Sequence, residues 1–410
     1  MNHTGPISVD SDSAQRRFGT KRSAIDFAEA LDLSVHDSIT SIKQDWKQAE
    51  QTSNISVYQR YEWVEAYLNT QSEKNDIRPF IIVGRFESEV VFILPFVLKG
   101  KFLTRVKFIG DSHVNFNMGI FPSAFKDVLT PNTFRQIFER IQKLTPGLGY
   151  LALCCQPERW RGTANPLMCE PHQRSANPAF FLDLSGGFEQ TLARGNAKRK
   201  RKKFRQQTRQ AEAYGGFELF KPETADDVKM LIDVFLLQKS NRLKQLGIRD
   251  VFADKQVRVF LTDLAKKSLG KKQPLLQLYG LKLGEEIAAV FGAGSSGEHL
   301  SGFFSSIDGD RYAEISPGEM LLYLVVEDAC AEGYQQMDLG AGDERYKRSW
   351  STEVVEMYEI FMPYNVLSYP AVLLRRLYGS IRRRIRKNES SWHFYKNLRK
   401  LKPKLLKKAV

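Results

Sequence analysis

A proline-rich segment near the middle of the chain constrains the fold more than any other feature of the sequence. Residues 156–178 contain four prolines and show little periodicity, which is typical of a connection between domains. Helical and extended patterns lie on both sides of it, and 410 residues are more than one ordinary domain of ~100–200 residues needs. The sequence therefore predicts two α/β domains with mixed sheets.

The two halves show similar patterns. In the first half, helical periodicity falls on 58–68 and 133–143, and β-rich runs fall on 79–86, 90–99, 105–109 and 150–155. In the second half, strands are expected at 179–184, 275–282, 286–292, 299–306, 335–339 and 354–361, and helices at 194–213, 225–246, 255–267, 317–332 and 343–349. We place the first domain at 34–165 and the second at 179–365.

Both ends of the chain differ from these domains. Residues 1–33 are polar and aperiodic, and we expect them to be disordered. Residues 366–410 carry apolar side chains at helical spacing amid arginines and lysines, which predicts a basic amphipathic tail. The first apolar stripe consists of Leu374, Leu377, Ile381 and Ile385, and the second of Phe394, Leu398, Leu401 and Leu405.

The net charge of +14 is concentrated in two segments. Residues 194–209 hold nine basic side chains and no acidic one, and residues 375–410 hold fourteen basic and one acidic, so the remaining chain carries −8. Such runs occur on tails and faces that meet polyanions, and equally on solvated helix faces. In residues 194–213, Ala197, Phe204 and Ala211 form a narrow apolar seam on the predicted cationic helix.

Several function classes lack their motifs. The four cysteines include no CxxC pair and the histidines are scattered, so we expect no metal site and a reducing cytoplasm. No GxSxG elbow and no Walker lysine loop are present, which argues against serine hydrolases and P-loop enzymes. We also expect neither a secretory signal nor a transmembrane helix, because no run of ~18 apolar residues occurs.

A strand, a loop and a helix start follow one another at 299–319. Ser316, Pro317 and Glu319 match a capping box, with serine at the N-cap and proline at the first helical position. A helix N-terminus after a strand favours an anion such as a pyrophosphate, although an ordinary capped helix has the same sequence.

A dense group of polar and aromatic residues follows the strand at 335–339. The segment from Asp338 to Trp350 combines two glycines with carboxylates, cations, a phenol and an indole. Such a group at the end of a strand fits a ligand crevice in an α/β sheet, and it also fits a loop with surface ion pairs.

These segments together resemble a known family. The SPG-headed helix and the block DLGAGDERYKRSW are similar to the acetyltransferase domain of the cellulose-biosynthesis acetyltransferases, relatives of the GNAT and FemAB transferases. The cationic helix at 194–213 resembles the family's basic helix, and the motifs at 93–96 and 108–111 resemble its amino-terminal half. The likeness covers about residues 55–362.

The resemblance implies two tandem GNAT-like domains, the second of which binds acyl-CoA as cosubstrate. It places the pyrophosphate at the turn formed by Ile315, Ser316 and Gly318, whose N–H groups would donate, with Arg311 adding charge. Pro317 has no N–H, which departs from the usual glycine-rich loop of GNAT enzymes.

The resemblance also suggests roles in acyl transfer. Tyr346 falls where many GNAT enzymes place the acid that protonates the departing thiolate, and a packing role is the alternative. Asp338 and Asp343 are candidate bases or groups that position the acceptor amine. The residues assigned to acceptor binding are Glu344, Lys347 and Trp350.

Three functional hypotheses follow. The leading one is a cytoplasmic acyl-CoA-dependent N- or O-acyltransferase acting on a saccharide or lipid-linked precursor of the envelope or of an exopolysaccharide. The second is a FemAB-like transferase that uses aminoacyl-tRNA, whose phosphates the basic helix would contact. The third is a non-catalytic adaptor at a membrane surface. In each case we expect residues 370–410 to meet an anionic membrane at its inner face rather than nucleic acid, because apolar stripes run through them.

Overall fold

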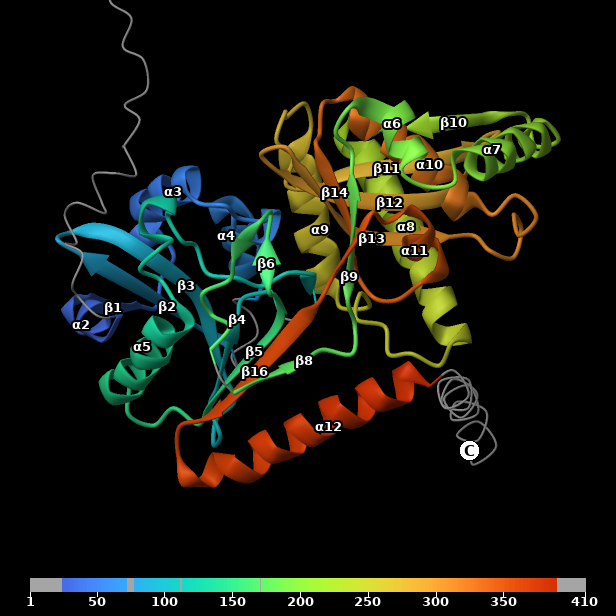
Figure 1. The fold of residues 1–410 in the computed structure, drawn as a ribbon. Coiled ribbons are helices and arrows are strands. Elements are labelled where there is room, and N and C mark those ends of the chain that lie inside the picture. Colours follow the sequence, from blue (N-terminus) through green and yellow to red (C-terminus); the bar gives the residue numbers. More distant parts are fainter. Residues whose placement is uncertain (1–23, 72–76, 111–112, 170, 389–410) are drawn as a thin grey trace, which may run out of the picture.

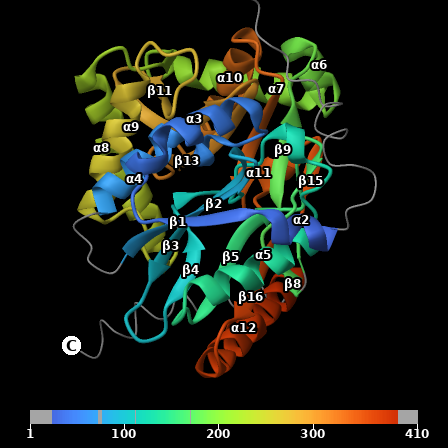
Figure 2. The ribbon, with the colours of Figure 1, turned by 90° about the vertical axis from the view of Figure 1, so that its left-hand side faces the viewer.

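The computed structural model describes residues 24–71, 77–110, 113–169 and 171–388. It contains two seven-stranded sheets, each with its own helices, which lie next to each other (Figure 1). Figure 2 shows the same arrangement from the side of the first sheet. The α/β class with mixed sheets is thus confirmed.

The first sheet is formed mainly by the amino-terminal half. Its strands, in spatial order, are β1 (Asp32–His36), β2 (Ile77–Phe86), β3 (Glu89–Lys99), β4 (Arg105–Phe108), β5 (Tyr150–Pro157), β16 (Met357–Pro363) and β8 (His172–Arg174). Its helices are α2 (Ala24–Ala30), α3 (Lys43–Thr52), α4 (Tyr61–Gln71), α5 (Pro131–Leu144) and α12 (Tyr369–Lys387). Neighbouring strands are antiparallel except β4 and β5, which are joined through α5.

The second sheet repeats this plan. Its strands, in spatial order, are β10 (Phe217–Phe220), β11 (Gln277–Leu283), β12 (Glu286–Ser296), β13 (His299–Ile307), β14 (Gln336–Ala341), β9 (Ala179–Asp183) and β15 (Glu353–Val355). Its helices are α6 (Gly187–Ala193), α7 (Ala197–Glu212), α8 (Ala225–Gln245), α9 (Lys255–Ser268), α10 (Pro317–Ala331) and α11 (Arg345–Trp350). Here β13 and β14 form the single parallel pair, joined through α10. A hairpin, β6 (Arg159–Trp160) and β7 (Thr163–Ala164), lies in the connection.

Side chains alternate between the two faces along the central strands, so each face of the first sheet packs into a different hydrophobic cluster. In β2, Phe80 and Ile82 pack with the cluster that includes α5, whereas Ile81 and Val83 pack with the cluster that includes α3 and α4. Successive side chains of a strand point to opposite faces, so an uninterrupted apolar run means that both faces are covered.

The second of these clusters also joins the two sheets. Trp63 of α4 is fully buried and meets Phe260 of α9 edge to face, with ring centroids 5.2 Å apart. Aromatic pairs of this kind contribute about 0.5–1.5 kcal/mol beyond the area that they bury. One continuous core therefore holds the two halves together.

One strand crosses from the second half back to the first sheet. The sequence predicts a single strand at 354–361 within the second domain. The structure divides it into β15, which pairs with β9, and β16, which pairs with β5 and β8 of the first sheet. The boundary at 365 therefore needs correction, because residues 357–363 complete the sheet of the first domain.

The expected disorder of the amino-terminal segment, residues 1–33, also needs correction. Residues 24–30 form α2, and Phe27 and Leu31 are buried against the first sheet, so the part of the predicted disordered segment from residue 24 onward is ordered. Residues 1–23 lie outside the described residues, as does the second predicted apolar stripe at 394–405. In the part of the chain that the structure describes, no helix has the length and apolar character needed to cross a bilayer.

Candidate functional site

The candidate site begins where β13 and β14 separate. The two parallel strands pair over three positions only, from His299 with Gln336 to Ser301 with Asp338. Beyond Asp338 the strands diverge, and β13 leads into α10 while β14 leads into α11. The gap opens at the carboxyl ends of two parallel strands, where open α/β sheets bind ligands.

Asn115, from the first domain, bridges this gap. Its side-chain amide donates to the carbonyl of Gly302 on β13 at 2.8 Å and to the phenol oxygen of Tyr58 at 3.1 Å. Its Oδ1 accepts from the N–H of Ala341 on β14, at 3.4 Å. Gly340 permits this approach, because a Cβ there would lie 2.7 Å from the Asn115 nitrogen and φ is +70°.

The turn before α10 differs from the predicted capping box. Ser316 has φ +58°, in the left-handed region, and its side chain makes no capping hydrogen bond. The N–H groups of Ile315 and Ser316 already donate to the carbonyls of Tyr312 and Ala313. Gly318 is thus the remaining member of the predicted N–H set.

Gln207 of α7 holds this turn in place. Its Nε2 donates to the carbonyl of Ile315 at 2.6 Å and to that of Ser316 at 3.2 Å. The cationic helix is therefore tied directly to the start of α10. Its predicted apolar seam is also present, since Phe204 stacks on Tyr323 of α10 with centroids 4.0 Å apart.

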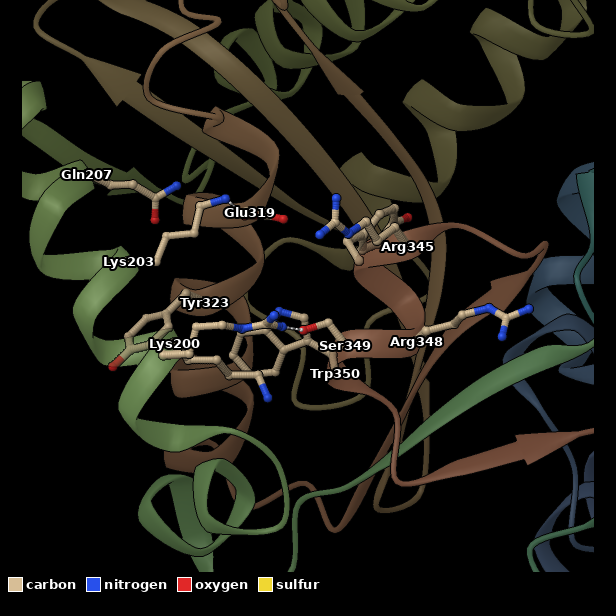
Figure 3. Close-up of a pocket in the computed structure, with 11 residues that line it drawn as sticks. Lys200, Lys203, Gln207, Glu319, Tyr323, Arg345, Arg348, Ser349 and Trp350 are labelled. Carbon is tan, nitrogen blue, oxygen red and sulfur yellow. Dashed lines mark hydrogen bonds and ion pairs between the residues drawn. The ribbon is translucent and has the colours of Figure 1, made fainter. Parts of the chain in front are cut away.

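A cavity of about 560 Å³ lies between α7, α10 and α11. Five of its lining side chains are cationic and one is a carboxylate (Figure 3). The lining residues are Arg199, Lys200, Lys203, Gln207, Glu319, Tyr323, Arg345, Tyr346, Arg348, Ser349 and Trp350. We call this space the cationic cavity.

The charges in the cationic cavity are only partly balanced. Burial and the nearby Arg199 lower the pKa of Lys200 and of Lys203. Lys203 forms an ion pair with Glu319, and Lys200 lies over the indole of Trp350 with its Nζ 4.6 Å from the ring centroid. Mutual repulsion among cations disfavours their charged forms, and a bound polyanion would relieve it.

A second cavity of about 230 Å³ also has Tyr346 in its lining. Most of its lining is apolar and comes from β12, β13 and α10, with two cations from α8. The lining residues are Lys239, Arg242, Val290, Phe291, Ser305, Ser306, Ile307, Gly318, Leu321, Leu322 and Tyr346. We call this space the apolar slot. Tyr346 lines both spaces, so the two cavities meet at this residue.

Tyr346 is kept in its neutral form. Burial raises the pKa of its phenol well above the ordinary value, and the charge of Glu344 adds to the rise, while a hydrogen bond with Ser305 opposes it. Lys239 lies nearby and donates to the carbonyl of Ser305 at 3.0 Å. Burial lowers the pKa of Lys239. A neutral, half-buried phenol at the junction of two cavities can donate a proton to a group bound there.

Three of the sequence-predicted site residues line these cavities. Tyr346 lines both, Trp350 lines the cationic cavity and Gly318 lines the apolar slot.

The predicted bases are engaged elsewhere. Asp338 is fully buried, where Oδ2 lies 2.9 Å from Nε2 of His299 and Oδ1 accepts from the N–H of Gly340. Asp343 forms an ion pair with Arg348, which lowers the pKa of its carboxyl. Both carboxylates serve as structural partners in this state.

The remaining predicted residues also have partners. Lys347 is buried, donates to the carbonyl of Ala341 and forms an ion pair with Glu344 across 3.0 Å. Arg311 forms an ion pair with Glu286 and is not among the residues that line either cavity. Neither cation therefore lines the two cavities.

Sequence reasoning missed Asn115, Lys239 and the individual cations of α7 that line the cavity. A signal for the last group exists, because Arg199, Lys203 and Gln207 follow one another at intervals of four and so share one face of a helix. Asn115 and Lys239 reach the site through tertiary packing and carry no local signal. Among the described residues, no cluster of histidine, cysteine and carboxylate side chains could hold a metal ion.

Comparisons with known proteins agree with this architecture. The sequence profile of a family described as acetyltransferase (GNAT) domain matches residues 198–348, which include α10, α7 from its second residue onward and the first four residues of α11. The chain therefore contains a GNAT acetyltransferase domain. A search of curated proteins finds no match.

Solved structures extend the likeness to both domains. The crystal structure of FemX aligns with a TM-score of 0.55 at 10% identity, covering 84% of this chain and 99% of FemX. A conserved protein of unknown function from Bacteroides thetaiotaomicron aligns with a TM-score of 0.50 at 12% identity, covering 81% of this chain and 100% of that protein. At such identities the likeness concerns the fold, which is that of two GNAT-like domains in tandem.

Proposed function

We propose that this protein is an acyltransferase that takes its acyl group from acyl-CoA, with the phosphates of the donor in the cationic cavity and the thioester beside Tyr346. One observation carries the proposal: a cavity with five cations and one carboxylate shares Tyr346 with a narrow apolar slot. Acyl-CoA has the matching chemistry, because its nucleotide is polyanionic and its acyl chain is apolar.

The donor fits the electrostatics of the cationic cavity. Phosphates favour the charged forms of lysines whose pKa values burial has lowered, and Arg199 and Arg345 can bind phosphate in a bidentate manner. Glu319, in the first turn of α10, lines the cationic cavity, so the positive end of that helix lies beside the proposed phosphate site.

Tyr346 is the proposed acid. The lone pair of an acceptor amine or hydroxyl attacks the thioester carbonyl, the carbon–sulfur bond breaks, and the departing thiolate takes the phenol proton of Tyr346. The proton that the acceptor loses returns through solvent to the phenolate, so the enzyme ends unchanged. Since the pKa of Tyr346 is raised, the phenol is neutral at the start of each cycle.

The acceptor and location are part of the proposal. The resemblance to cellulose-biosynthesis acetyltransferases supports an amine or hydroxyl of an envelope or exopolysaccharide precursor as the acceptor. The same resemblance supports a cytoplasmic location for the enzyme.

A transferase that uses aminoacyl-tRNA is the second candidate, and one observation favours it. The outer face of α7 carries Lys202, Arg205 and Arg209 along another hollow, so cations lie on both faces of the helix. An RNA is long enough to contact both faces, whereas CoA is a smaller ligand.

Two measurements separate these candidates from each other and from a non-catalytic adaptor. The first is the thermal stability of the protein with acetyl-CoA or with aminoacyl-tRNA. The second is release of free thiol from acetyl-CoA in the presence of a panel of amine and hydroxyl acceptors. Stabilisation by acetyl-CoA with thiol release supports our proposal, whereas stabilisation by aminoacyl-tRNA alone would replace it. Absence of both would indicate an adaptor.

The role of Tyr346 is tested in the same assay. We expect Tyr346→Phe to lower kcat by about 10²–10⁴-fold with little change in KM for acetyl-CoA, because a general acid acts in the transition state. Tyr214→Phe is the matched control, since Tyr214 lines neither cavity. Full turnover by Tyr346→Phe would show that the phenol has only a packing role.

A further inference from the structure

The helix α12 lies along one side of the first domain (Figure 1). It contacts β16, and Val372 packs in a small cluster with Tyr150 and Phe361. Amphipathic surface helices normally turn their apolar stripe toward the protein. In α12, most of the large apolar side chains are exposed instead.

Arginines occupy the inner side of α12. Arg375 donates to the phenol oxygen of Tyr150 at 2.9 Å, and Arg376 donates to the carbonyl of Phe361 at 2.5 Å. About two turns further along, Arg383 donates to the carbonyl of Arg174 at 2.9 Å. These bonds fix the rotation of the helix about its axis.

The opposite side of α12 and its preceding turn are apolar and exposed. Large apolar side chains here are Val366, Leu367, Tyr369, Leu373, Leu374, Leu377, Tyr378 and Ile381. They make up eight of the eighteen large apolar side chains that are exposed in the described residues, within a segment of sixteen. Single exposed apolar residues are normal on a protein surface, whereas a contiguous stripe marks an interaction site. We call this set the outer stripe.

A neighbouring loop adds to this surface. Phe102 is fully exposed in the turn between β3 and β4, next to Lys101. The adjacent Leu103 packs against the same small cluster that holds Val372. An exposed aromatic side chain flanked by lysine thus lies close to the start of α12.

We propose that the outer stripe is a docking surface for an anionic lipid membrane. The charge of this part of the chain identifies the occupant: residues 375–410 contain fourteen basic side chains and one acidic one. Apolar groups bury into the interface of the bilayer, while the exposed Arg382 and Arg384 meet its headgroups.

The same charges argue against other occupants. A second copy docked on the outer stripe would bring two strongly cationic segments together. A nucleic acid would bind through outward-facing cations and would give the apolar stripe no role. In α12, three of the arginines point inward instead.

The far end of α12 lies near the proposed donor site. Arg386 is close enough to Glu344 and Asp343, which precede α11, for their charges to oppose the lowering of its pKa by burial and by Arg382. A membrane on the outer stripe would therefore hold the site close to the lipid headgroups.

The test uses the full-length protein and vesicles of phosphatidylcholine with or without phosphatidylglycerol. The variant carries Leu373→Gln, Leu377→Gln and Ile381→Gln, all exposed positions whose change leaves the inner contacts of α12 in place. The matched control carries Leu237→Gln, Val251→Gln and Val259→Gln, which are exposed on the second domain. We expect binding to the anionic vesicles to fall about a hundredfold for the variant and less than about threefold for the control.

The outcomes decide between the occupants. Unchanged binding of the variant to anionic vesicles would overturn the proposal, because the remaining cations alone would then account for it. Dimerisation in light scattering that the variant abolishes, without vesicle binding by the wild type, would assign the stripe to a second copy. Thermal stabilisation by acetyl-CoA is measured on the same variant. Because donor binding and vesicle binding are separate readouts, a failure of the docking proposal can be told apart from a failure of the proposed function.

Discussion

Asn115 offers a sharp test of how the first domain supports the candidate site. Its amide nitrogen donates to the Gly302 carbonyl and to the Tyr58 phenol, both of which are buried. Asn115→Ala removes both donors, and Asn115→Asp replaces them with a carboxylate. Charge and hydrogen bonding can therefore be separated at one position.

The structure sets the size of the effects. Each buried polar group that loses its partner costs about 1–3 kcal/mol, and because Asn115 is half-buried, water can partly replace it. We expect Asn115→Ala to lower the free energy of unfolding by about 2–4 kcal/mol. Asn115→Asp should cost about 1–2 kcal/mol more at pH 7, because the new charge faces a carbonyl and lies near buried Asp338. Burial, and after it Asp338, already raises the pKa of the neighbouring Tyr58.

The free energy of unfolding of Asn115→Asp should depend on pH. Burial and Asp338 should raise the pKa of the introduced carboxyl above its unfolded value. The extra cost is then present above the folded pKa and shrinks as pH falls through it, since the protonated carboxyl can donate. Guanidinium unfolding followed by tryptophan fluorescence at pH 7 and pH 5 measures this. If Asn115→Asp were as stable as Asn115→Ala at pH 7, the proposed contact between the domains would be wrong.

Three further predictions concern the same region. Gly340→Ala alone should lower the free energy of unfolding by more than about 2 kcal/mol. In the Asn115→Ala background the loss should be only about 1 kcal/mol, because the clash with the Asn115 amide is gone and only the positive φ remains. Equal losses in both backgrounds, measured by denaturant unfolding, would contradict the close approach of Gly340 and Asn115. Binding of CoA should take up protons at alkaline pH, because phosphates raise the lowered pKa values of Lys200 and Lys203. The affinity for CoA should therefore fall as pH rises through those values. Calorimetry in two buffers of different ionisation enthalpy would show no proton uptake if the two lysines lay outside the site. Gln207→Glu should weaken CoA binding about tenfold, since a carboxylate cannot donate to the turn before α10; unaltered affinity would show that the turn does not depend on α7.

Local patterns in the sequence predicted much of the fold. Phe204 lies on the apolar seam of a cationic helix, and its contact with Tyr323 follows from burying that seam. Pro317 marks the first residue of α10, as its fixed φ favours. The parallel pair of β13 and β14 follows from a strand, a helix and a strand in succession.

The errors arose where tertiary contacts override local patterns. The serine, proline and glutamate spacing fits a capping box, but Ser316 adopts a left-handed conformation and Gln207 holds the turn instead. The run at 354–361 reads as one strand, and nothing local shows that its second part returns to the first sheet. In α12 the apolar stripe is where the sequence predicts it, but only the contacts of the arginines show that it faces outward.

The central claim is that the cationic cavity binds the phosphates of acyl-CoA, and the dissociation constant of acetyl-CoA tests it most directly. Two variants with equal net charge are compared by calorimetry: Arg199→Gln with Arg345→Gln inside the cavity, and Lys202→Gln with Arg205→Gln on the outer face of α7. We predict that the cavity variant raises the dissociation constant about tenfold to a hundredfold, and the outer variant less than about threefold, since a charge-assisted hydrogen bond contributes about 1.5–3 kcal/mol. Equal losses for both variants, or no binding by the wild-type protein, would contradict the account.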